Sequence, residues 1–187
     1  MRIVGGRLRG HALAGPRTAT VRPTSDRLRE SLFNILRHTY DLPRAGTRAL
    51  DLFAGTGALG LEALSRGADH ALFVESGVEG RGIIRTNIEK LALTGSTRLL
   101  RRDATDLGSV GTIPPFDLVF CDPPYGTTLA AAALASAAKG GWMNPDALCV
   151  VEDRAGTEAE PPAGFELEQR RVTGGSQLLF LKWRPQD

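Results

Sequence analysis

The sequence predicts a Rossmann-like α/β fold, in which helices cover both faces of a mostly parallel sheet. From residue 47 onward, short apolar segments that suit buried strands alternate with longer segments of helical periodicity. After this alternation, two strand-like segments flank Thr173-Gly174-Gly175, which indicates a closing antiparallel hairpin. The chain has 187 residues, enough for one such domain and a small β/α extension at its N-terminus.

The N-terminal extension is expected to span residues 1–40. Its two segments 2–4 and 7–9 flank Gly5-Gly6 and indicate a β-hairpin. A helix is expected to follow, because Pro23 disfavours helix before it and Thr24, Ser25 or Asp26 can cap its first amides. Apolar side chains then recur at helical spacing, at Leu28, Leu32, Phe33, Ile35 and Leu36.

The main domain is expected to span residues 41–187. Its predicted strands are 48–53, 70–75, 97–101, 116–121 and 147–152, followed by 165–172 and 176–183 in the hairpin. Its predicted helices are 58–66, 78–92 and 128–139.

Composition favours a soluble cytoplasmic protein that acts as a monomer. No apolar run approaches the roughly 18 residues of a membrane span, and no secretory signal is visible at the start of the chain. Cys121 and Cys149 both lie in apolar, strand-like segments, so we interpret them as buried free thiols. Their spacing fits no zinc pattern, and no metal is expected.

The net charge of +2 is unevenly distributed. Residues 1–37 contain eight arginines against two acidic residues, which gives +6 for this stretch and leaves −4 for the remainder. A basic arm on a mildly acidic body favours a polyanionic partner, although a solvated basic face accounts for the charge equally well. The arginines expected to bind the phosphates of such a partner are Arg7, Arg9, Arg17, Arg22 and Arg27.

A glycine-rich motif stands where the first strand of the main domain ends and a helix begins. It is Asp51-Leu52-Phe53-Ala54-Gly55-Thr56-Gly57. Glycines there let the backbone approach a ligand closely, and such sheets bind ligands at the carboxyl ends of their strands. The motif lacks the dinucleotide pattern G-x-G-x-x-G and the Gly-Lys-Ser/Thr of a phosphate loop. Asp51 disfavours a phosphate and suits an ammonium group, such as that of S-adenosylmethionine.

Acidic residues also follow the next two predicted strands. Glu75 is placed to accept both hydroxyls of a ribose, and Asp103 to accept a hydrogen bond from an adenine amino group. Each of them alone is more often a helix cap or a solvated turn. Acidic residues at three consecutive strand ends favour a nucleoside ligand.

A second motif, Asp122-Pro123-Pro124-Tyr125, follows the predicted strand 116–121. Its prolines hold the chain extended, so the Asp122 carboxylate and a backbone carbonyl are expected to converge. Such a pair accepts both hydrogens of a planar amino group, which exposes the nitrogen lone pair to a methyl donor. Tyr125 is expected to stack on the base that carries this amino group. In isolation, a simple Pro-Pro turn at a strand end is a competing interpretation.

The residues also carry a resemblance that spans nearly the whole chain. The segments 2–10, 22–34 and 51–68 closely resemble the RsmD-like family of bacterial 16S rRNA guanine-N2 methyltransferases, and Asp122 to Tyr125 resembles its catalytic tetrad. The two N-terminal segments make the resemblance specific, since many amino methyltransferases share the other two.

The resemblance implies a class I methyltransferase fold with a seven-stranded sheet and an antiparallel C-terminal hairpin. It implies methyl transfer from S-adenosylmethionine, which leaves as S-adenosylhomocysteine, to a guanine of 16S rRNA, guanine 966 in that family. The substrate would be RNA in a partly or fully assembled small subunit. The implied catalytic residues are Asp122, Pro123, Pro124 and Tyr125. The implied cofactor-binding residues are Asp51, Phe53, Ala54, Gly55, Thr56, Gly57, Glu75, Ser76, Asp103, Ala104 and Asp122.

Three other functions share parts of this pattern. A DNA or other RNA amino methyltransferase that acts on adenine N6 uses the same two motifs, but only 62 residues follow Tyr125, too few for a large DNA-recognition domain. A methyltransferase for protein glutamine is disfavoured by the basic arm. A non-catalytic RNA-binding assembly factor is disfavoured by the intact Asp51, Glu75 and Asp122.

Overall fold

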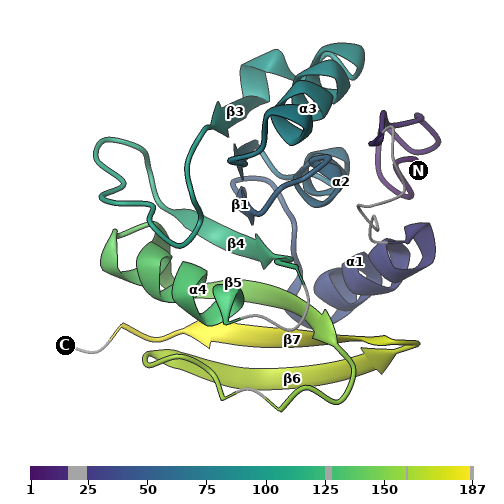
Figure 1. Cartoon of the computed structure of the whole chain (residues 1–187). Helices are drawn as coiled ribbons and strands as arrows, with labels where there is room; N and C mark the ends of the chain where they lie inside the picture. The colour runs from purple at the N-terminus through teal and green to yellow at the C-terminus, as the bar shows by residue number, and fades with distance from the viewer. Residues whose placement is uncertain (17–24, 125–127, 159, 186–187) are drawn as a thin grey trace.

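The computed structural model describes residues 1–16, 25–124, 128–158 and 160–185. Within these ranges the chain forms one seven-stranded sheet in the order β3-β2-β1-β4-β5-β7-β6 (Figure 1). The strands β3, β2, β1, β4 and β5 run parallel, and β7 runs antiparallel to both β5 and β6. The strands are β1 (Arg48–Leu52), β2 (His70–Val74), β3 (Thr97–Leu100), β4 (Phe116–Cys121), β5 (Met143–Arg154), β6 (Phe165–Thr173) and β7 (Ser176–Trp183).

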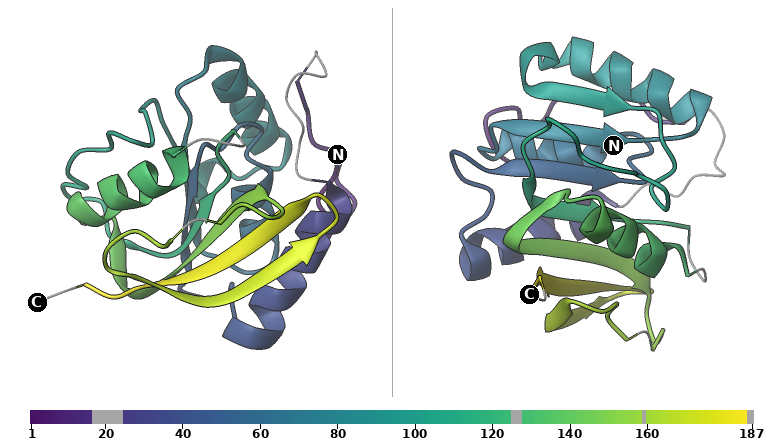
Figure 2. Two further views of the ribbon diagram at one scale, coloured as in Figure 1. Left: turned by 60° about the horizontal axis from the view of Figure 1, so that its bottom comes forward. Right: turned by 90° about the vertical axis from the view of Figure 1, so that its left-hand side faces the viewer.

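Helices cover both faces of this sheet (Figure 2). On one face lie α1 (Asp26–Tyr40), α2 (Ala58–Ser65) and α3 (Val78–Lys90), and on the other lie α4 (Leu129–Lys139) and the loop that follows β3. A short 3₁₀ helix, η1 (Thr94–Ser96), precedes β3. Because successive strand side chains point to opposite faces and both faces are covered, the central strands are almost wholly apolar. None of the helices in the described ranges is long and apolar enough to cross a membrane.

The central parallel strands end together at one edge of the sheet. Leu52 at the end of β1 pairs with Val74 at the end of β2 and with Cys121 at the end of β4. Val74 pairs in turn with Leu100 at the end of β3. The residues that follow these four strands therefore meet at one carboxyl edge, the usual ligand-binding edge of such a sheet.

The structure confirms the predicted fold class and most of its elements. Strands 116–121 and 176–183 have the predicted bounds, and the other strands and helices of the main domain differ mainly at their ends. The largest difference is β5, which extends the predicted 147–152 in both directions. Its start pairs with Phe116 of β4 and its end pairs with Ser176 of β7, so neighbouring strands lengthen it beyond its apolar centre.

The first helix has the predicted cap and the predicted apolar stripe. The Ser25 side chain accepts a hydrogen bond from the backbone N–H of Leu28 at 3.2 Å. Arg29 on the same helix is fully buried, and its guanidinium donates to the Arg2 carbonyl and to the Asp26 carboxylate, at 2.5 and 2.7 Å. Arg29 therefore holds the helix against the N-terminal segment, and its charge adds nothing to the basic surface expected for a phosphate partner.

The N-terminal segment makes an antiparallel contact with other arms than predicted. Residues 1–3 run against residues 10–13, with a bridge between Arg2 and Ala12 and backbone hydrogen bonds that join the two stretches. The predicted second arm, residues 7–9, is part of the turn between them. Two amides of this turn bind the end of α2: Arg7 N–H donates to the Ser65 carbonyl at 2.8 Å, and Leu8 N–H to the Ser65 hydroxyl at 3.0 Å. A helix C-terminus offers unpaired carbonyls, so it supplies a partner for the turn.

Candidate active site

A tight loop, residues 53–57, connects β1 to α2 at the carboxyl edge. Phe53, Gly55 and Gly57 have positive φ values of 58°, 55° and 79°. Gly57 is also the N-cap residue of α2, and a Cβ atom there would lie 3.3 Å from side chains of α3 and β2. The left-handed conformation is strained for a phenylalanine, and such strain is typical of functional loops. We call residues 53–57 the cofactor loop, for the ligand that their sequence predicts.

Asp51 lies beneath this loop with only 2% of its surface exposed. It shares a face of β1 with Ala49 and so faces α2, where its carboxylate accepts the Gly60 N–H at 2.9 Å. Burial raises the pKa of the Asp51 carboxyl well above its ordinary value; the bond from Gly60 opposes this rise, and the charges of Asp122 and Glu75 add to it.

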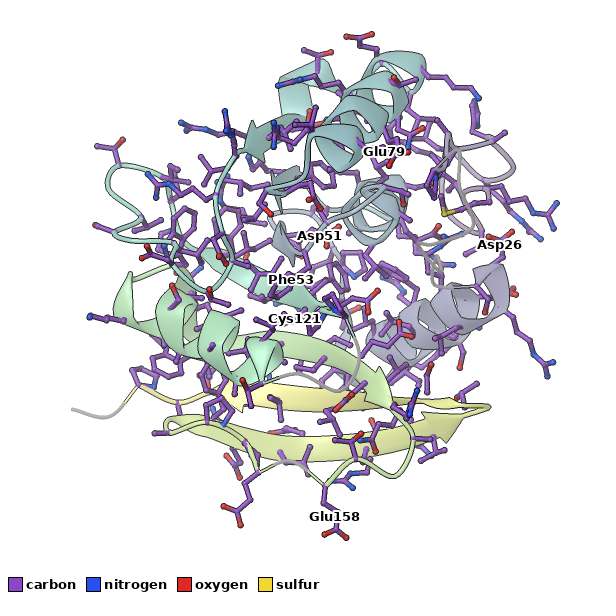
Figure 3. All side chains as sticks on the ribbon, in the orientation of Figure 1. Asp26, Asp51, Phe53, Glu79, Cys121 and Glu158 are labelled. Atoms are coloured by element: carbon purple, nitrogen blue, oxygen red, sulfur yellow. The ribbon has the colours of Figure 1, made fainter. Side chains whose placement is uncertain are left out.

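Three carboxyl groups therefore influence one another at the strand ends. Among the described residues, no basic side chain forms an ion pair with Asp51. A buried carboxylate flanked by two others is stabilised by any cation that binds beside it. This local charge suits a ligand with an ammonium or sulfonium group. Figure 3 shows Asp51 of β1, Phe53 of the cofactor loop and Cys121 of β4 near the centre of the molecule.

Glu75 holds the cofactor loop in place. One carboxylate oxygen accepts the Gly55 N–H at 2.8 Å and the other accepts the Gly77 N–H at 2.7 Å. The side chain is partly exposed, and Ser76 beside it is fully on the surface. Each carboxylate oxygen has a further lone pair, so the loop contacts leave capacity for hydroxyl donors.

Asp103 forms a local turn beyond β3. Its Oδ1 accepts hydrogen bonds from the Thr105 N–H and hydroxyl, at 2.8 and 2.7 Å. These bonds hold the pKa of the exposed Asp103 carboxyl below its ordinary value. Ala104 next to it is buried in the core on the α4 side of the sheet. The Asp103 side chain is thus fixed as an ionised acceptor at the same edge.

Asp122 directly follows β4, two positions beyond Phe120, which pairs with Asp51 of the adjacent strand. Its charge raises the pKa of the buried Asp51 and Cys121 side chains, after the larger effect of burial. The raised pKa keeps the Cys121 thiol neutral, and both cysteines are free and buried as predicted. Pro123 is buried and Pro124 is exposed, whereas Tyr125, the last residue of the motif, lies outside the described residues.

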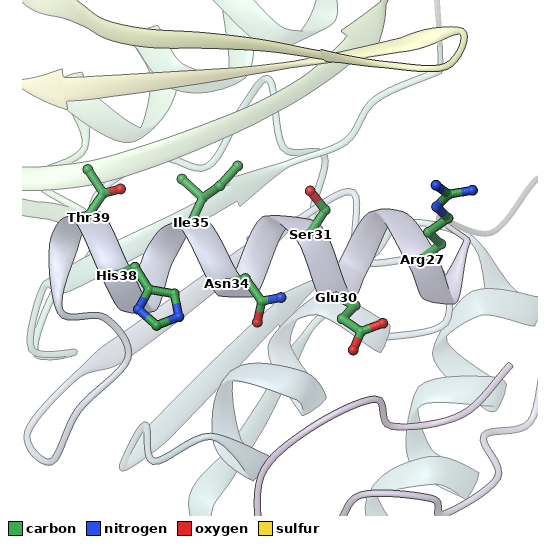
Figure 4. Close-up of a pocket in the computed structure, with 7 residues that line it drawn as sticks. All are labelled: Arg27, Glu30, Ser31, Asn34, Ile35, His38 and Thr39. Carbon is green, nitrogen blue, oxygen red and sulfur yellow. The ribbon is translucent and has the colours of Figure 1, made fainter.

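The arginines expected to bind RNA are spread over two elements. Arg7 and Arg9 are exposed on the N-terminal segment, and Arg27 is exposed on α1. Arg17 and Arg22 lie outside the described residues. Arg27 borders a shallow groove of about 450 Å³ that follows the outer face of α1 (Figure 4). The other residues that line this groove are Glu30, Ser31, Asn34, Ile35, His38 and Thr39.

One residue that contacts the cofactor loop was missed by the sequence reasoning. Asn87 of α3 is fully buried and donates to the Thr56 carbonyl at 3.0 Å. A signal was present, because Asn87 falls on the same helical stripe as Ile84 and Ile88, where a polar side chain needs an internal partner.

Known proteins match both this sequence and this fold. The family described as Conserved hypothetical protein 95 matches residues 1–182. The chain belongs to this family. It is 36% identical to ribosomal RNA small subunit methyltransferase D of Escherichia coli, over 93% of this chain and 85% of that protein. The Haemophilus influenzae protein of the same name is 32% identical, over 93% and 89% of the two chains.

A solved structure extends this agreement to three dimensions. The Escherichia coli protein yhhF superimposes with a TM-score of 0.81 at 33% identity, covering 100% of this chain and 99% of that one. The matches confirm the resemblance drawn from the N-terminal segments and the two strand-end motifs. Membership places the chain among the methyltransferases of class I fold.

Proposed function

We propose that this enzyme transfers the methyl group of S-adenosylmethionine to the exocyclic N2 of a guanine in 16S rRNA, guanine 966 by likeness to its family. The observation that carries this proposal is the meeting of Asp51, Glu75 and Asp122 at one carboxyl edge, around a strained glycine loop. The relatives named above act on ribosomal RNA of the small subunit, which supports the RNA class of the substrate.

The donor set at this edge fits S-adenosylmethionine. The buried Asp51 carboxylate would bind the ammonium group of the methionine part, which would offset the cost of burying its charge. Glu75 would accept the ribose hydroxyls with the lone pairs not used by the cofactor loop, and Ser76 would border the sugar. Asp103 and Ala104 would contact the adenine, the first as acceptor and the second as part of the apolar surface. When bound, the cofactor supplies an electrophilic methyl group on a sulfonium.

Asp122 would act on the incoming base. Its carboxylate and a backbone carbonyl of the proline pair would accept the two N2 hydrogens of guanine, and Tyr125 would stack on the ring. These bonds favour a pyramidal nitrogen whose lone pair attacks the methyl carbon. The new C–N bond forms as the C–S bond breaks, and the proton of the methylated nitrogen leaves through Asp122 or water. S-adenosylhomocysteine and N2-methylguanine are the products.

The arginine-rich N-terminus would bind the RNA backbone. Arg7 and Arg9 are exposed on a segment fixed to α2, and Arg27 is exposed on α1, so the two elements could contact phosphates on one strand. Arg17 and Arg22 belong to the same proposal. The substrate would be 16S rRNA within a partly or fully assembled small subunit, modified by a cytoplasmic monomer without a metal.

The test is labelled methyl transfer to small subunits purified from a strain that lacks this enzyme. The expected result is one labelled N2-methylguanine in 16S rRNA, located by nuclease mapping and mass spectrometry. Label in N6-methyladenine would instead support the alternative amino methyltransferase, and absence of label from both naked RNA and subunits would overturn the proposed substrate. Matched subunits that already carry the modification serve as the control.

A further inference from the structure

Asn87 joins two segments that have separate roles in the proposed reaction. Its side-chain oxygen accepts the Ala14 N–H at 2.7 Å, and its amide nitrogen donates to the Ala14 carbonyl at 3.2 Å and to the Thr56 carbonyl at 3.0 Å. Ala14 belongs to the N-terminal segment and Thr56 to the cofactor loop. All three contacts use backbone atoms of the partner, so within these three hydrogen bonds only the Asn87 side chain can be changed by substitution.

The chemistry of these contacts requires an amide side chain. Two carbonyls need two N–H donors, and one N–H needs an acceptor, which uses both donors of a primary amide and one lone pair of its oxygen. Aspartate has the same shape but offers no donor, and alanine offers neither. The residue has no exposed surface, so water cannot replace a lost partner there without rearrangement.

Two further contacts define what the N-terminal segment binds. The Met1 sulfur lies 3.8 Å from the Thr56 hydroxyl, so the segment reaches the cofactor loop at its first residue as well as through Ala14. Lys90, one turn after Asn87 on α3, donates to the Ala12 carbonyl at 2.7 Å from an exposed position. Lys90 thus contacts the N-terminal segment without contacting the loop, which makes it a matched control.

We propose that Asn87 is a positioning residue that couples the cofactor loop to the N-terminal segment, residues 1–16. Cofactor binding fixes the loop, the Asn87 amide transmits that order to Ala14, and the segment that carries Arg7 and Arg9 becomes better ordered for RNA. By thermodynamic reciprocity, RNA on the segment strengthens cofactor binding by the same factor. This inference rests on the proposed function for the identity of both ligands.

The first experiment uses no RNA. Amide hydrogen exchange of residues 12–15 is measured in the full chain with and without S-adenosylmethionine. In the wild type the cofactor should slow exchange at these amides by at least about fivefold. Asn87→Asp should lose this protection and Lys90→Ala should retain it. Equal protection in Asn87→Asp and wild type, or no protection in the wild type that binds cofactor, would overturn the proposal.

The second experiment measures both ligands. The dissociation constant for unmodified small subunits is determined with and without S-adenosylhomocysteine, which permits no turnover. We expect a ratio of about five or more in the wild type and Lys90→Ala, falling towards one in Asn87→Asp. A purely structural role would lower the melting temperature and leave the ratio unchanged, which refutes the coupling.

A second variant controls for a folding defect in Asn87→Asp. Ala14→Pro removes the N–H that Asn87 accepts while the core of α3 stays intact, and it should lose the same exchange protection. The outcomes also separate the two proposals. If the cofactor protects these amides but no methyl group is transferred to subunits, the coupling is supported and the proposed substrate is refuted. If methyl transfer is normal but the cofactor gives no protection, the proposed substrate is supported and the coupling is refuted.

Discussion

Replacing Asp51 with asparagine should stabilise the ligand-free protein and strongly lower its affinity for the cofactor. Asparagine keeps the shape of the side chain and an oxygen that can accept the Gly60 N–H. In the wild type this N–H lies 2.9 Å from the Asp51 carboxylate. It removes a buried charge whose pKa is raised by burial and by the nearby Asp122 and Glu75. Single stabilising substitutions commonly contribute about 0.5–2 kcal/mol, and we expect a gain in this range when the buried charge is removed. For a chain of this length that is about 1–8 °C in melting temperature.

The pH dependence of this gain follows from the direction of the pKa shift. A carboxyl group whose folded pKa is raised contributes its stability at low pH, and this contribution is lost as the pH rises through the folded pKa. The advantage of Asp51→Asn over wild type should therefore be largest near neutral pH and should vanish in acid, where Asp51 is itself neutral. Thermal unfolding without ligand, at several pH values, measures it.

Cofactor affinity should change in the opposite direction. A hydrogen bond between a carboxylate and an ammonium group contributes about 1.5–3 kcal/mol, so asparagine should weaken S-adenosylmethionine binding about 10- to 150-fold by calorimetry. Wild-type affinity should fall in acid as Asp51 is protonated. Unchanged affinity in Asp51→Asn would refute the ammonium contact. A variant less stable than wild type at neutral pH would show that the charged bond to Gly60 outweighs burial and repulsion.

The remaining expectations concern other parts of the molecule. Asp122→Ala should lower methyl transfer about a hundredfold or more at nearly unchanged cofactor affinity, and normal turnover would refute its contact with the amino group. Glu75→Ala should weaken cofactor binding about 10- to 100-fold by calorimetry, since the loop and the ribose both lose an acceptor; equal affinity would refute the ribose role. Arg7→Ala with Arg9→Ala should reduce the slope of log affinity for RNA against log salt by about 1.5, and an unaltered slope would show that neither binds phosphate. Glu62→Ala should cost about 3–5 kcal/mol in urea unfolding, because it leaves Arg66 and the Val4 N–H without their buried partner, whereas the exposed Glu89→Ala should stay within about 0.5 kcal/mol.

The sheet could be predicted from the sequence because the local patterns of its strands favour the same structure as their tertiary contacts. The apolar run that ends at Cys121 and the acidic residues that follow each strand suffice to place a ligand at the carboxyl edge, since parallel strands in register must end together. The Ser25 cap was predictable for the same reason, as its partner Leu28 is three residues away.

Long-range partners could not be derived from the same patterns. The segment 1–16 has the glycine spacing of a hairpin, but the Arg7 and Leu8 amides, in its predicted second arm, bind Ser65 at the end of α2, 58 and 57 positions along the chain. Arg29 looks like a surface charge in sequence and is fully buried against the Arg2 carbonyl. Asn87 is a polar residue on an apolar helical stripe. This pattern predicts that its side chain has a buried hydrogen-bond partner, but it does not identify that partner.

The attachment of the N-terminal segment to distant helices constrains the order in which the chain can fold during synthesis. Residues 1–16 precede their partners Ser65 and Asn87 by 57 to 73 positions, so during translation their amides gain these partners only after α2 and α3 have been made. Only a chain translated beyond Asn87 of α3 therefore has all the partners on which residues 1–16 dock.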